Sequence, residues 1–363
     1  MNSYGWTAEE NFDDVTLEHR ASQNRTSPRD PKSVTVIVVN YNGGALLRSC
    51  IEGLLRQTFH DFDVIIMDNG STDGSIGQLP VLPRSFRVVL AHQNLGFAVA
   101  NNVAARQTSS PWIALLNPDA FPDPDWLARL LDAAERYPQA SFFGSMQLDA
   151  DNPTRIDGAG DVYHAFGIAW RADIGRPVSF SQRSEAETFG PCAAAAMYYR
   201  EDFLELGGFD DRFFCYLEDV DLAFRLRLAG RHCVQVPSAV VRHKGSAISG
   251  RDSEFSVYHN ARNGIWVFLK NMPLPLILLL LPGFILTQLF YVLRAAQRGL
   301  YKPTLRGIRD ALAGIGQVLE ARKGIQDTRR LSIFALARIL CWSPVKAARR
   351  SAHTWPISAG SNR

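Results

Sequence analysis

The chain has few cysteines, and their spacing excludes two classes of site. Its 363 residues contain five cysteines. They form no C-x-x-C pair and no even framework, so neither a zinc site nor a disulfide scaffold is indicated. Such thiols fit a reducing cytosol. The five are Cys50, Cys192, Cys215, Cys233 and Cys341.

Three other signals are missing from the sequence. Residues 1–33 are polar and lack the apolar core of an export signal, so we predict a disordered leader there. No recognition motif supports a nucleic-acid partner, and a net charge of +3 says little by itself. The turn after the first apolar run lacks the G-x-G-x-x-G pattern of dinucleotide-binding domains, which argues against a dehydrogenase.

The chain does contain a regular alternation of strand-like and helical patterns. The strand-like runs are continuously apolar and mostly β-branched, which suits strands buried on both faces of a sheet. The alternation predicts an α/β fold with a mostly parallel, doubly wound sheet. The predicted strands are 34–39, 62–67, 86–91 and 112–116, and the predicted helices are 45–56, 97–106 and 125–136.

Four acidic or amide clusters recur along the chain. The first three follow predicted strands, so their polar side chains should lie at the carboxyl ends of strands, where open α/β sheets bind ligands. This layout predicts a nucleotide site. The clusters are VVNYN at 38–42, MDNGSTDG at 67–74, LLNPDA at 115–120 and YLEDVD at 216–221.

The C-terminal part combines an apolar run with basic residues. Residues 274–293 are uncharged and about as long as the roughly 20 residues that a membrane span needs. Prolines interrupt the run, so an interfacial helix or a core helix would have a similar composition. The segment from Arg294 to Arg350 contains thirteen Lys and Arg but only three acidic residues. An anionic cytoplasmic leaflet attracts such an excess of positive charge. We predict a membrane-associating helical region at 273–350 and a flexible tail at 351–363.

Six segments in register resemble those of inverting family 2 glycosyltransferases with a GT-A fold, most of all the bacterial rhamnosyltransferase-like branch. The resemblance covers residues 34–272. The segments are VTVIVVNYN, DNGSTDGS, NLGFAVANN, LLNPDA, GGFDDRFFCYLEDVDLAFRLRLAG and VRHKGS.

The resemblance implies an enzyme that moves a sugar from a nucleotide sugar, such as dTDP-rhamnose, to a lipid-linked or cell-surface glycan. It would work at the cytoplasmic face of a bacterial membrane. The alternative is a protein that binds a sugar nucleotide or glycan on the same fold without turnover. A nucleotidyltransferase would need a basic phosphate-binding loop near the first strand, and the sequence has none.

The resemblance assigns donor contacts to two groups of residues. Asn40, Tyr41 and Asp68 match positions that hold the base and ribose; a strand-end carboxylate can accept a base N–H or a ribose hydroxyl. Asp68 could instead open a turn.

Asn94, Gly96 and Asn101 belong to a segment that leads into a helix lining the nucleotide pocket. Gly96 would permit close backbone approach near the helix start. Asn101 could equally bond to the local backbone.

The resemblance also implies a divalent cation, Mg²⁺ or Mn²⁺. Asp119 occupies the second position of the family's D-x-D motif, and Asn117 replaces the first aspartate. Mg²⁺ accepts few protein carboxylates beside phosphate oxygens, so Asp119 can still serve, with Asn117 orienting sugar or phosphate. His243 matches a histidine that completes the metal shell, although a lone histidine is more often structural.

Asp219 matches the general base that deprotonates the acceptor hydroxyl in a single inverting displacement. The adjacent Glu218 would tend to raise the pKa of that base. Acidic residues at this point would also favour the start of the following helix without any role in catalysis.

Overall fold

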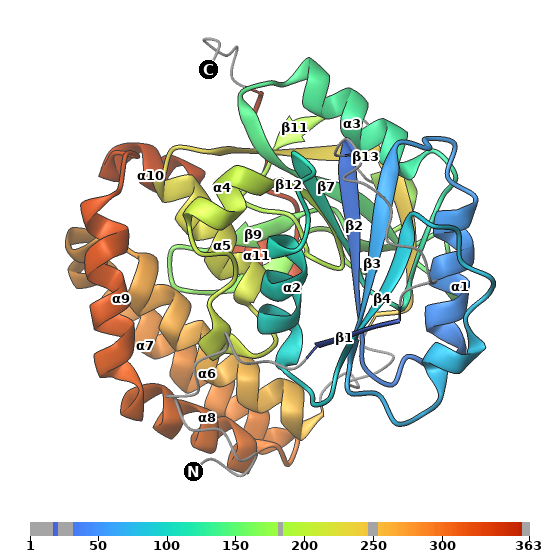
Figure 1. Cartoon of the computed structure of the whole chain (residues 1–363). Helices are drawn as coiled ribbons and strands as arrows, with labels where there is room; N and C mark the ends of the chain where they lie inside the picture. Colours follow the sequence, from blue (N-terminus) through green and yellow to red (C-terminus); the bar gives the residue numbers. More distant parts are fainter. Residues whose placement is uncertain (1–16, 21–31, 181–183, 246–252, 358–363) are drawn as a thin grey trace.

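The computed structural model describes residues 17–20, 32–180, 184–245 and 253–357. Within these residues, eleven strands form one twisted sheet and two more form a separate hairpin (Figure 1). The strands are β1 Leu17–Arg20, β2 Val34–Asn40, β3 Phe62–Asn69, β4 Phe86–Ala91, β5 Trp112–Leu116, β6 Ala120–Pro122, β7 Ala140–Asp149, β8 Ile156–Gly158, β9 Asp161–Tyr163, β10 Ala169–Arg171, β11 Ala186–Glu187, β12 Ala195–Tyr199 and β13 His232–His243.

The helices lie on both faces of this sheet and in a group at one end of it. They are α1 Gly44–Leu55, α2 Gly96–Arg106, α3 Trp126–Arg136, α4 Arg200–Glu205, α5 Glu218–Leu228, α6 Glu254–Asn271, α7 Leu274–Gln297, α8 Tyr301–Ala313, α9 Ile315–Asp327, α10 Ile333–Ile339 and α11 Pro344–Arg349.

The sheet joins a parallel half to a mixed half. Its order is β1-β4-β3-β2-β5-β12-β7-β13-β11. The neighbours β4, β3, β2 and β5 are all parallel, and β12 enters antiparallel between β5 and β7. The predicted α/β fold with a largely parallel core is confirmed. The antiparallel additions were not predicted, because their short runs lie in segments without clear periodicity.

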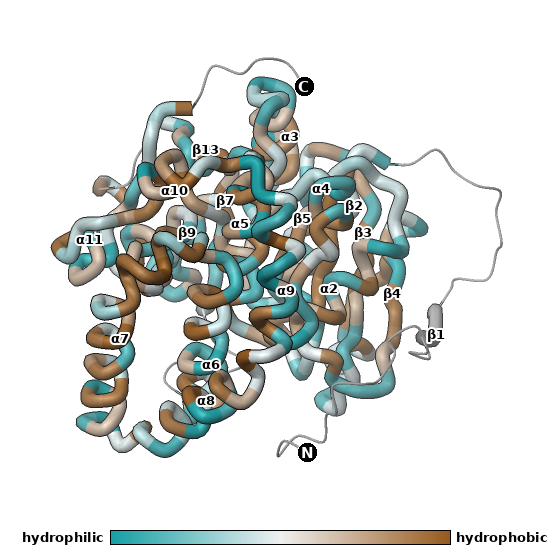
Figure 2. The backbone as a smooth tube through the Cα atoms, turned by 90° about the vertical axis from the view of Figure 1, so that its left-hand side faces the viewer, coloured by the Kyte–Doolittle hydropathy of each residue, from teal (hydrophilic) through white to brown (hydrophobic). Residues whose placement is uncertain are grey.

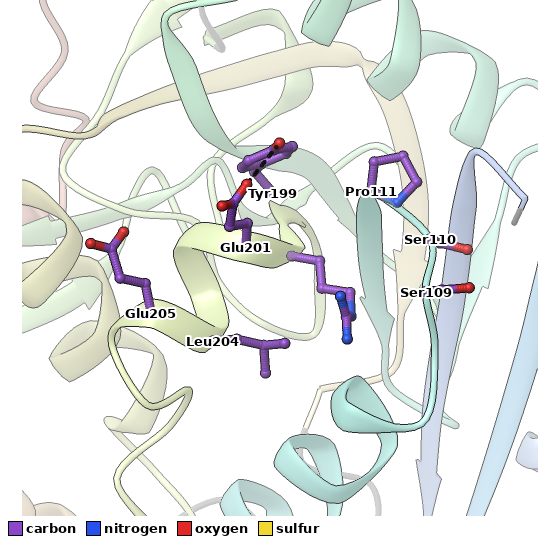
Figure 3. Close-up of a pocket in the computed structure, with 8 residues that line it drawn as sticks. Ser109, Ser110, Pro111, Tyr199, Glu201, Leu204 and Glu205 are labelled. Carbon is purple, nitrogen blue, oxygen red and sulfur yellow. Dashed lines mark hydrogen bonds between the residues drawn. The ribbon is translucent and has the colours of Figure 1, made fainter.

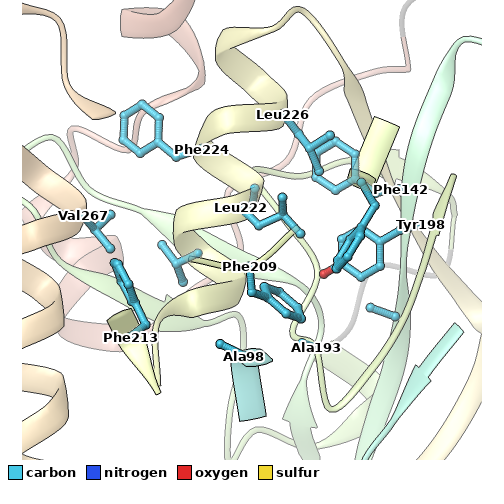
Figure 4. Close-up of a cluster of buried hydrophobic side chains, with 14 of the residues drawn as sticks. Ala98, Phe142, Ala193, Tyr198, Phe209, Phe213, Leu222, Phe224, Leu226 and Val267 are labelled. Atoms are coloured by element: carbon cyan, nitrogen blue, oxygen red, sulfur yellow. The ribbon is translucent and has the colours of Figure 1, made fainter. Parts of the chain in front are cut away.

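Side chains of the central strands alternate between two cores. In β2, Val34, Val36 and Val38 enter the core under α1 and α3, while Ile37 and Val39 enter the core under α2 and α5. The second core includes the aromatic cluster of Figure 4, where Phe209 packs near Tyr198. Burial on both faces explains why the central strands are almost wholly apolar.

The C-terminal helices share this second core. Ala311 of α8, Val318 of α9 and Leu336 of α10 are buried in the same cluster as Phe224 of α5. Residues 273–350 therefore pack as a continuation of the sheet domain's core. Helix α7 lies at the margin, where Figure 2 shows it as a mostly apolar helix.

Parts of the two predicted flexible ends are ordered against the domain. In the leader, β1 pairs antiparallel with β4, whereas residues 1–16 and 21–31 lie outside the described residues. In the tail, Trp355 exchanges backbone hydrogen bonds with Glu187, and residues 358–363 lie outside the described part. The indole of Trp355 also lies 5.3 Å under the guanidinium of Arg227, a contact that sequence periodicity does not encode.

Candidate active site

A large cleft of about 1950 Å³ opens at the carboxyl ends of β2 and β5. It extends past the β9–β10 hairpin and the start of α5 to helix α7. The cleft therefore lies at the sheet edge that the polar clusters predicted. Its walls include eight of the residues singled out in the sequence, namely Tyr41, Asn94, Gly96, Asn117, Asp119, Glu218, Asp219 and His243.

Asn40 and Asp68 lie beneath the cleft wall. They are paired across β2 and β3 and are 0% and 6% exposed. The Asn40 amide donates to Asp68 Oδ1 at 2.9 Å and to the hydroxyl of Ser75 at 2.9 Å. Asp68 Oδ2 accepts a hydrogen bond from the backbone amide of Ser71 at 3.2 Å. Asp68 therefore opens a turn, which was the alternative to a role in binding the donor. Tyr41, which follows Asn40, is 39% exposed and reaches the cleft.

The segment before α2 is held by side-chain amides. Asn94 Oδ1 accepts the Gly96 amide at 3.0 Å. Gly96 has φ +80°, and a Cβ there would lie 2.5 Å from the Phe214 ring. The backbone that approaches Gly96 is that of Phe214, whose carbonyl accepts the first helical amides of α2, from Phe97 and Ala98. This helix N-terminus is thus already occupied by a protein group.

Asn101 lies away from the cleft, 1% exposed inside α2. Its amide donates to the Phe97 carbonyl one turn earlier, at 2.9 Å. This is the hydrogen bond to the local backbone that was the alternative to a role for Asn101 in the nucleotide pocket.

Asp119 and His243 face each other across the end of the sheet. His243 Nε2 lies 3.3 Å from Asp119 Oδ1, and both side chains are buried. Asp157 Oδ2 fixes the other ring nitrogen, Nδ1, at 2.7 Å. Burial acts to lower the pKa of His243, but the carboxylates of Asp119 and Asp157 outweigh it and raise that pKa. Asn117 reaches the same wall of the cleft.

These residues fit a divalent cation by their chemistry. His243 Nε2 and Asn117 Oδ1 are buried and lack a well-formed hydrogen bond within the described residues. A carboxylate holding the far nitrogen of a ligating histidine is the usual outer-shell arrangement in metal sites. Over the described ranges, no three His, Cys, Asp or Glu side chains form a complete metal cluster. An ion here would therefore need oxygens from a ligand or from water, as Mg²⁺ commonly does.

Asp219 is held in one orientation by the backbone. Its Oδ2 accepts the Ala193 amide at 3.0 Å and its Oδ1 accepts the Val220 amide at 2.8 Å. Burial raises the pKa of Asp219, against the effect of these amides. Burial and the neighbouring Asp219 raise the pKa of Glu218 well above its usual range. Both carboxyl groups thus have increased proton affinity, as general bases and acids require near neutral pH.

The loop before Asp219 is strained and is clamped from α6. Phe214, Tyr216 and Leu217 all have positive φ, at 63°, 70° and 64°, a region that costs non-glycine residues of the order of 1–3 kcal/mol each. The Asn263 amide of α6 bonds to the carbonyls of Phe213, Cys215 and Tyr216. Helix α6 therefore sets the direction in which α5 begins.

Two charged residues in the cleft were not identified from the sequence. Asp161 of β9 is 4% exposed, and burial together with the charge of Asp219 raises its pKa well above normal. Arg171 of β10 forms an ion pair with Asp157. Its positive charge also acts to lower the pKa of Asp161. Both belong to the segment 155–171, in which β9 and β10 pair as an antiparallel hairpin. Neither carries a motif of its own.

A second pocket, of about 570 Å³, lies elsewhere (Figure 3). It is formed by Pro111 before β5 and by Tyr199, Glu201 and Glu205 around α4. Because β5 runs from Trp112 to Leu116, this pocket lies at the amino end of the strand, opposite Asn117 and Asp119. This pocket shares no lining residue with the cleft that contains Asp119 and Asp219.

Comparison with known proteins identifies relatives that transfer sugars. The family model described as glycosyl transferase family 2 matches residues 35–207. The chain is 30% identical over 251 residues to the N-acetylglucosaminyl-diphospho-decaprenol L-rhamnosyltransferase of Mycobacterium tuberculosis strain H37Rv, covering 62% of this chain and 81% of that protein. It is 31% identical over 237 residues to the O-antigen biosynthesis protein RfbC of Myxococcus xanthus, covering 62% of this chain and 18% of that protein.

A solved structure agrees with the fold. The crystal structure of GalNAc-T7 with UDP, GalNAc and Mn2+ aligns with a TM-score of 0.55 at 14% identity, covering 67% of this chain and 48% of that one. At this identity the similarity concerns the fold, which is GT-A-like, as predicted. The mycobacterial relative and the family model show that the chain is a glycosyltransferase and belongs to family 2, in the rhamnosyltransferase-like branch.

Proposed function

We propose that this protein is an inverting, metal-dependent glycosyltransferase that moves rhamnose from dTDP-rhamnose to a lipid-linked or cell-surface glycan. The observation that carries the proposal is the position of Asp219. Two backbone amides aim its carboxylate, and the cleft that it lines is also lined by Asp119 and His243. The name of the mycobacterial relative supports rhamnose and a lipid diphosphate acceptor.

Asp219 acts as the general base. Its carboxylate takes the proton of the acceptor hydroxyl while the oxygen attacks the anomeric carbon from the face opposite the nucleotide, which inverts the configuration. The raised pKa of Asp219 makes it a stronger base than a free carboxylate. Glu218, whose raised pKa favours its neutral form, limits the repulsion beside the base.

The opposite wall holds the donor. Tyr41 offers an exposed ring at the end of β2 for the base and ribose, while Asn40 and Asp68 fix the loop that carries it. Asp119 and His243 would hold Mg²⁺ or Mn²⁺, with Asn117 directed toward phosphate or sugar oxygens. The cation would supply positive charge that stabilises the departing nucleoside diphosphate.

The test is a donor screen with purified full-length protein, with Mg²⁺ or Mn²⁺ and then with EDTA. Slow metal-dependent hydrolysis of dTDP-rhamnose, and not of UDP- or GDP-sugars, is the expected result. Asp219→Asn should lower kcat about 10²- to 10⁴-fold with nucleotide affinity unchanged, whereas Asp132→Asn, on the exposed side of α3, should change neither. Full turnover by Asp219→Asn would exclude the proposed base.

We further propose that the protein works at the cytoplasmic face of the membrane, with α7 lying in the interface. Among the described helices, α7 alone is long and apolar enough to cross a membrane, with a mean hydropathy of 2.3. Its inner residues Leu276, Leu280 and Phe284 are buried against the domain, and Gly283 contacts Phe166 so closely that a Cβ would lie 2.5 Å from the ring. A helix packed in this way along the domain has only its outer face left for lipid.

A further inference from the structure

The two faces of α7 differ in polarity along its second half. On the outer face, Leu286, Leu289 and Leu293 are exposed. On the inner face, the buried stripe of Leu276, Leu280 and Phe284 is continued at helical spacing by polar residues. These are Gln288, Tyr291, Arg294 and Arg298, and all four line the cleft. The helix thus separates an apolar surface from the end of a polar cavity.

Basic residues gather at this end of the cleft. Arg294 lies in the last turn of α7, and Arg298 follows one turn later as the residue that caps the helix. Arg350, just after α11, lines the same space. Within the described residues, Arg294 and Arg350 have no acidic partner. Burial raises the pKa of Tyr291, and the guanidinium groups of Arg350 and Arg294 act to lower it. Both guanidinium groups therefore lie near the same phenol, although they come from different helices.

The three arginines are exposed to solvent, and their place at this end of the cleft favours one kind of anion. Guanidinium groups bind phosphate oxygens by paired, charge-assisted hydrogen bonds. The proposed function places the donor's diphosphate near Asp119 and His243, which lie 3.3 Å apart at the strand ends. The arginines instead border the exposed apolar face of α7, where a ligand with a hydrocarbon chain could keep that chain in lipid.

We propose that Arg294, Arg298 and Arg350 form a binding site for the phosphate or diphosphate of a lipid-linked acceptor. The head group enters the cleft along the inner face of α7, and its lipid remains against the outer face. The inference rests on the proposed function, because it gives the acceptor's phosphate a place in the cleft that holds Asp219. The site is specific for a phosphate ester carried by a lipid and does not depend on which sugar follows it.

The first test measures binding without turnover. Full-length protein in detergent and EDTA is titrated with farnesyl diphosphate, farnesol and inorganic pyrophosphate. We expect farnesyl diphosphate to bind more tightly than either comparison compound. The double variant Arg294→Gln/Arg350→Gln should weaken its binding tenfold or more, since charge-assisted hydrogen bonds are lost. Lys302→Gln, an exposed basic position on α8 outside the cleft, and Asp119→Asn should leave it unchanged.

Four results would overturn the inference. Equal binding of farnesol would mean that the phosphate is not recognised. Equal weakening by Lys302→Gln would indicate general surface charge, and equal weakening by Asp119→Asn would place the diphosphate at the strand ends. Loss of binding to phosphatidylglycerol vesicles by the arginine variant, with farnesyl diphosphate affinity intact, would assign the arginines to bulk membrane lipid.

A second test separates this inference from the proposed function. Transfer is measured to a phosphate-bearing lipid acceptor and to an alkyl glycoside with the same sugar. The arginine variant should raise KM tenfold or more for the first acceptor only, with kcat unchanged. Absence of turnover in the wild-type protein, with arginine-dependent binding of farnesyl diphosphate, would reject the proposed function alone. Normal transfer with equal KM values in both proteins would reject the arginine site alone.

Discussion

The two ends of the cleft are built in different ways. At the strand-end side, Asn117, Asp119 and His243 follow or end β5 and β13, so the hydrogen-bonded sheet fixes their backbone. At the helical side, Arg294 and Arg298 extend from a helix whose outer face is exposed. The rigid side suits chemistry that tolerates little displacement, and the helical side suits the lipid-borne ligand proposed above. The contrast raises the question of whether the two sides are independent.

The largest effect on folding is expected from Asn263→Ala, which tests that independence. Asn263 is 0% exposed and its amide bonds to three carbonyls of the strained loop. Leaving buried acceptors unpaired should lower the free energy of unfolding by about 3 kcal/mol, measured by denaturant titration. The loop carries α5, so kcat should fall as well. Asn260→Ala, whose amide bonds only to the Ser256 carbonyl in its own helix, should change stability far less. Unchanged kcat in folded Asn263→Ala would mean that the two sides are uncoupled.

A smaller effect, confined to the strand-end side, is expected from Asp119→Asn. Removal of one charged ligand should weaken dTDP binding in Mn²⁺ about tenfold to a hundredfold, measured by calorimetry. In EDTA the variant and the wild type should bind dTDP equally. Equal weakening in both conditions would assign Asp119 to the nucleotide itself and not to a cation.

The pH dependence of activity tests the proposed base, Asp219, which lies between the two sides of the cleft. A base must be deprotonated, so activity is lost as pH falls through its pKa. Because burial raises the pKa of Asp219, the acid limb of kcat/KM should lie above the value of about 4 that a free carboxylate shows. The measurement is kcat/KM for a phosphate-free acceptor across pH, with the folded state monitored at each point. An acid limb at about 4 would mean that the site does not shift its base.

The smallest effect on folding is expected at the outer face of α7. The double variant Leu286→Glu/Leu293→Glu alters side chains that are 67% and 65% exposed, so the free energy of unfolding should change by no more than about 0.5 kcal/mol. Co-sedimentation with phosphatidylglycerol vesicles should be lost, while transfer to a soluble acceptor persists. Gln297→Glu, at the end of the same helix, is the matched control and should still bind vesicles. Vesicle binding by the double variant would contradict the proposed orientation.

The sequence predicted the strand-end side better than the helical side. Continuous β-branched runs identify buried parallel strands, and polar residues at their ends, such as Asn117 and Asp119, were therefore placed correctly at one edge. Side-chain orientation was not predictable: Asn40 and Asp68 turn into an internal network because Ser71 and Ser75 offer closer partners than a ligand would. Asp161 and Arg171 were missed because they lie in short strands whose pairing depends on distant residues.

The hydrogen bonds from Asn263 also affect the order in which parts of the protein can fold during synthesis. The loop at 213–217 is made before α6, yet its carbonyls are paired only when residue 263 has left the ribosome. The core beneath it is complete only after Leu336 and Leu340 have been added. Domains generally fold as units during synthesis, so in a nascent chain that ends before α6 the loop ahead of α5 lacks its side-chain partner. The loop that leads into Asp219 is therefore completed late in translation, after α6 and the helices that follow it have joined the core.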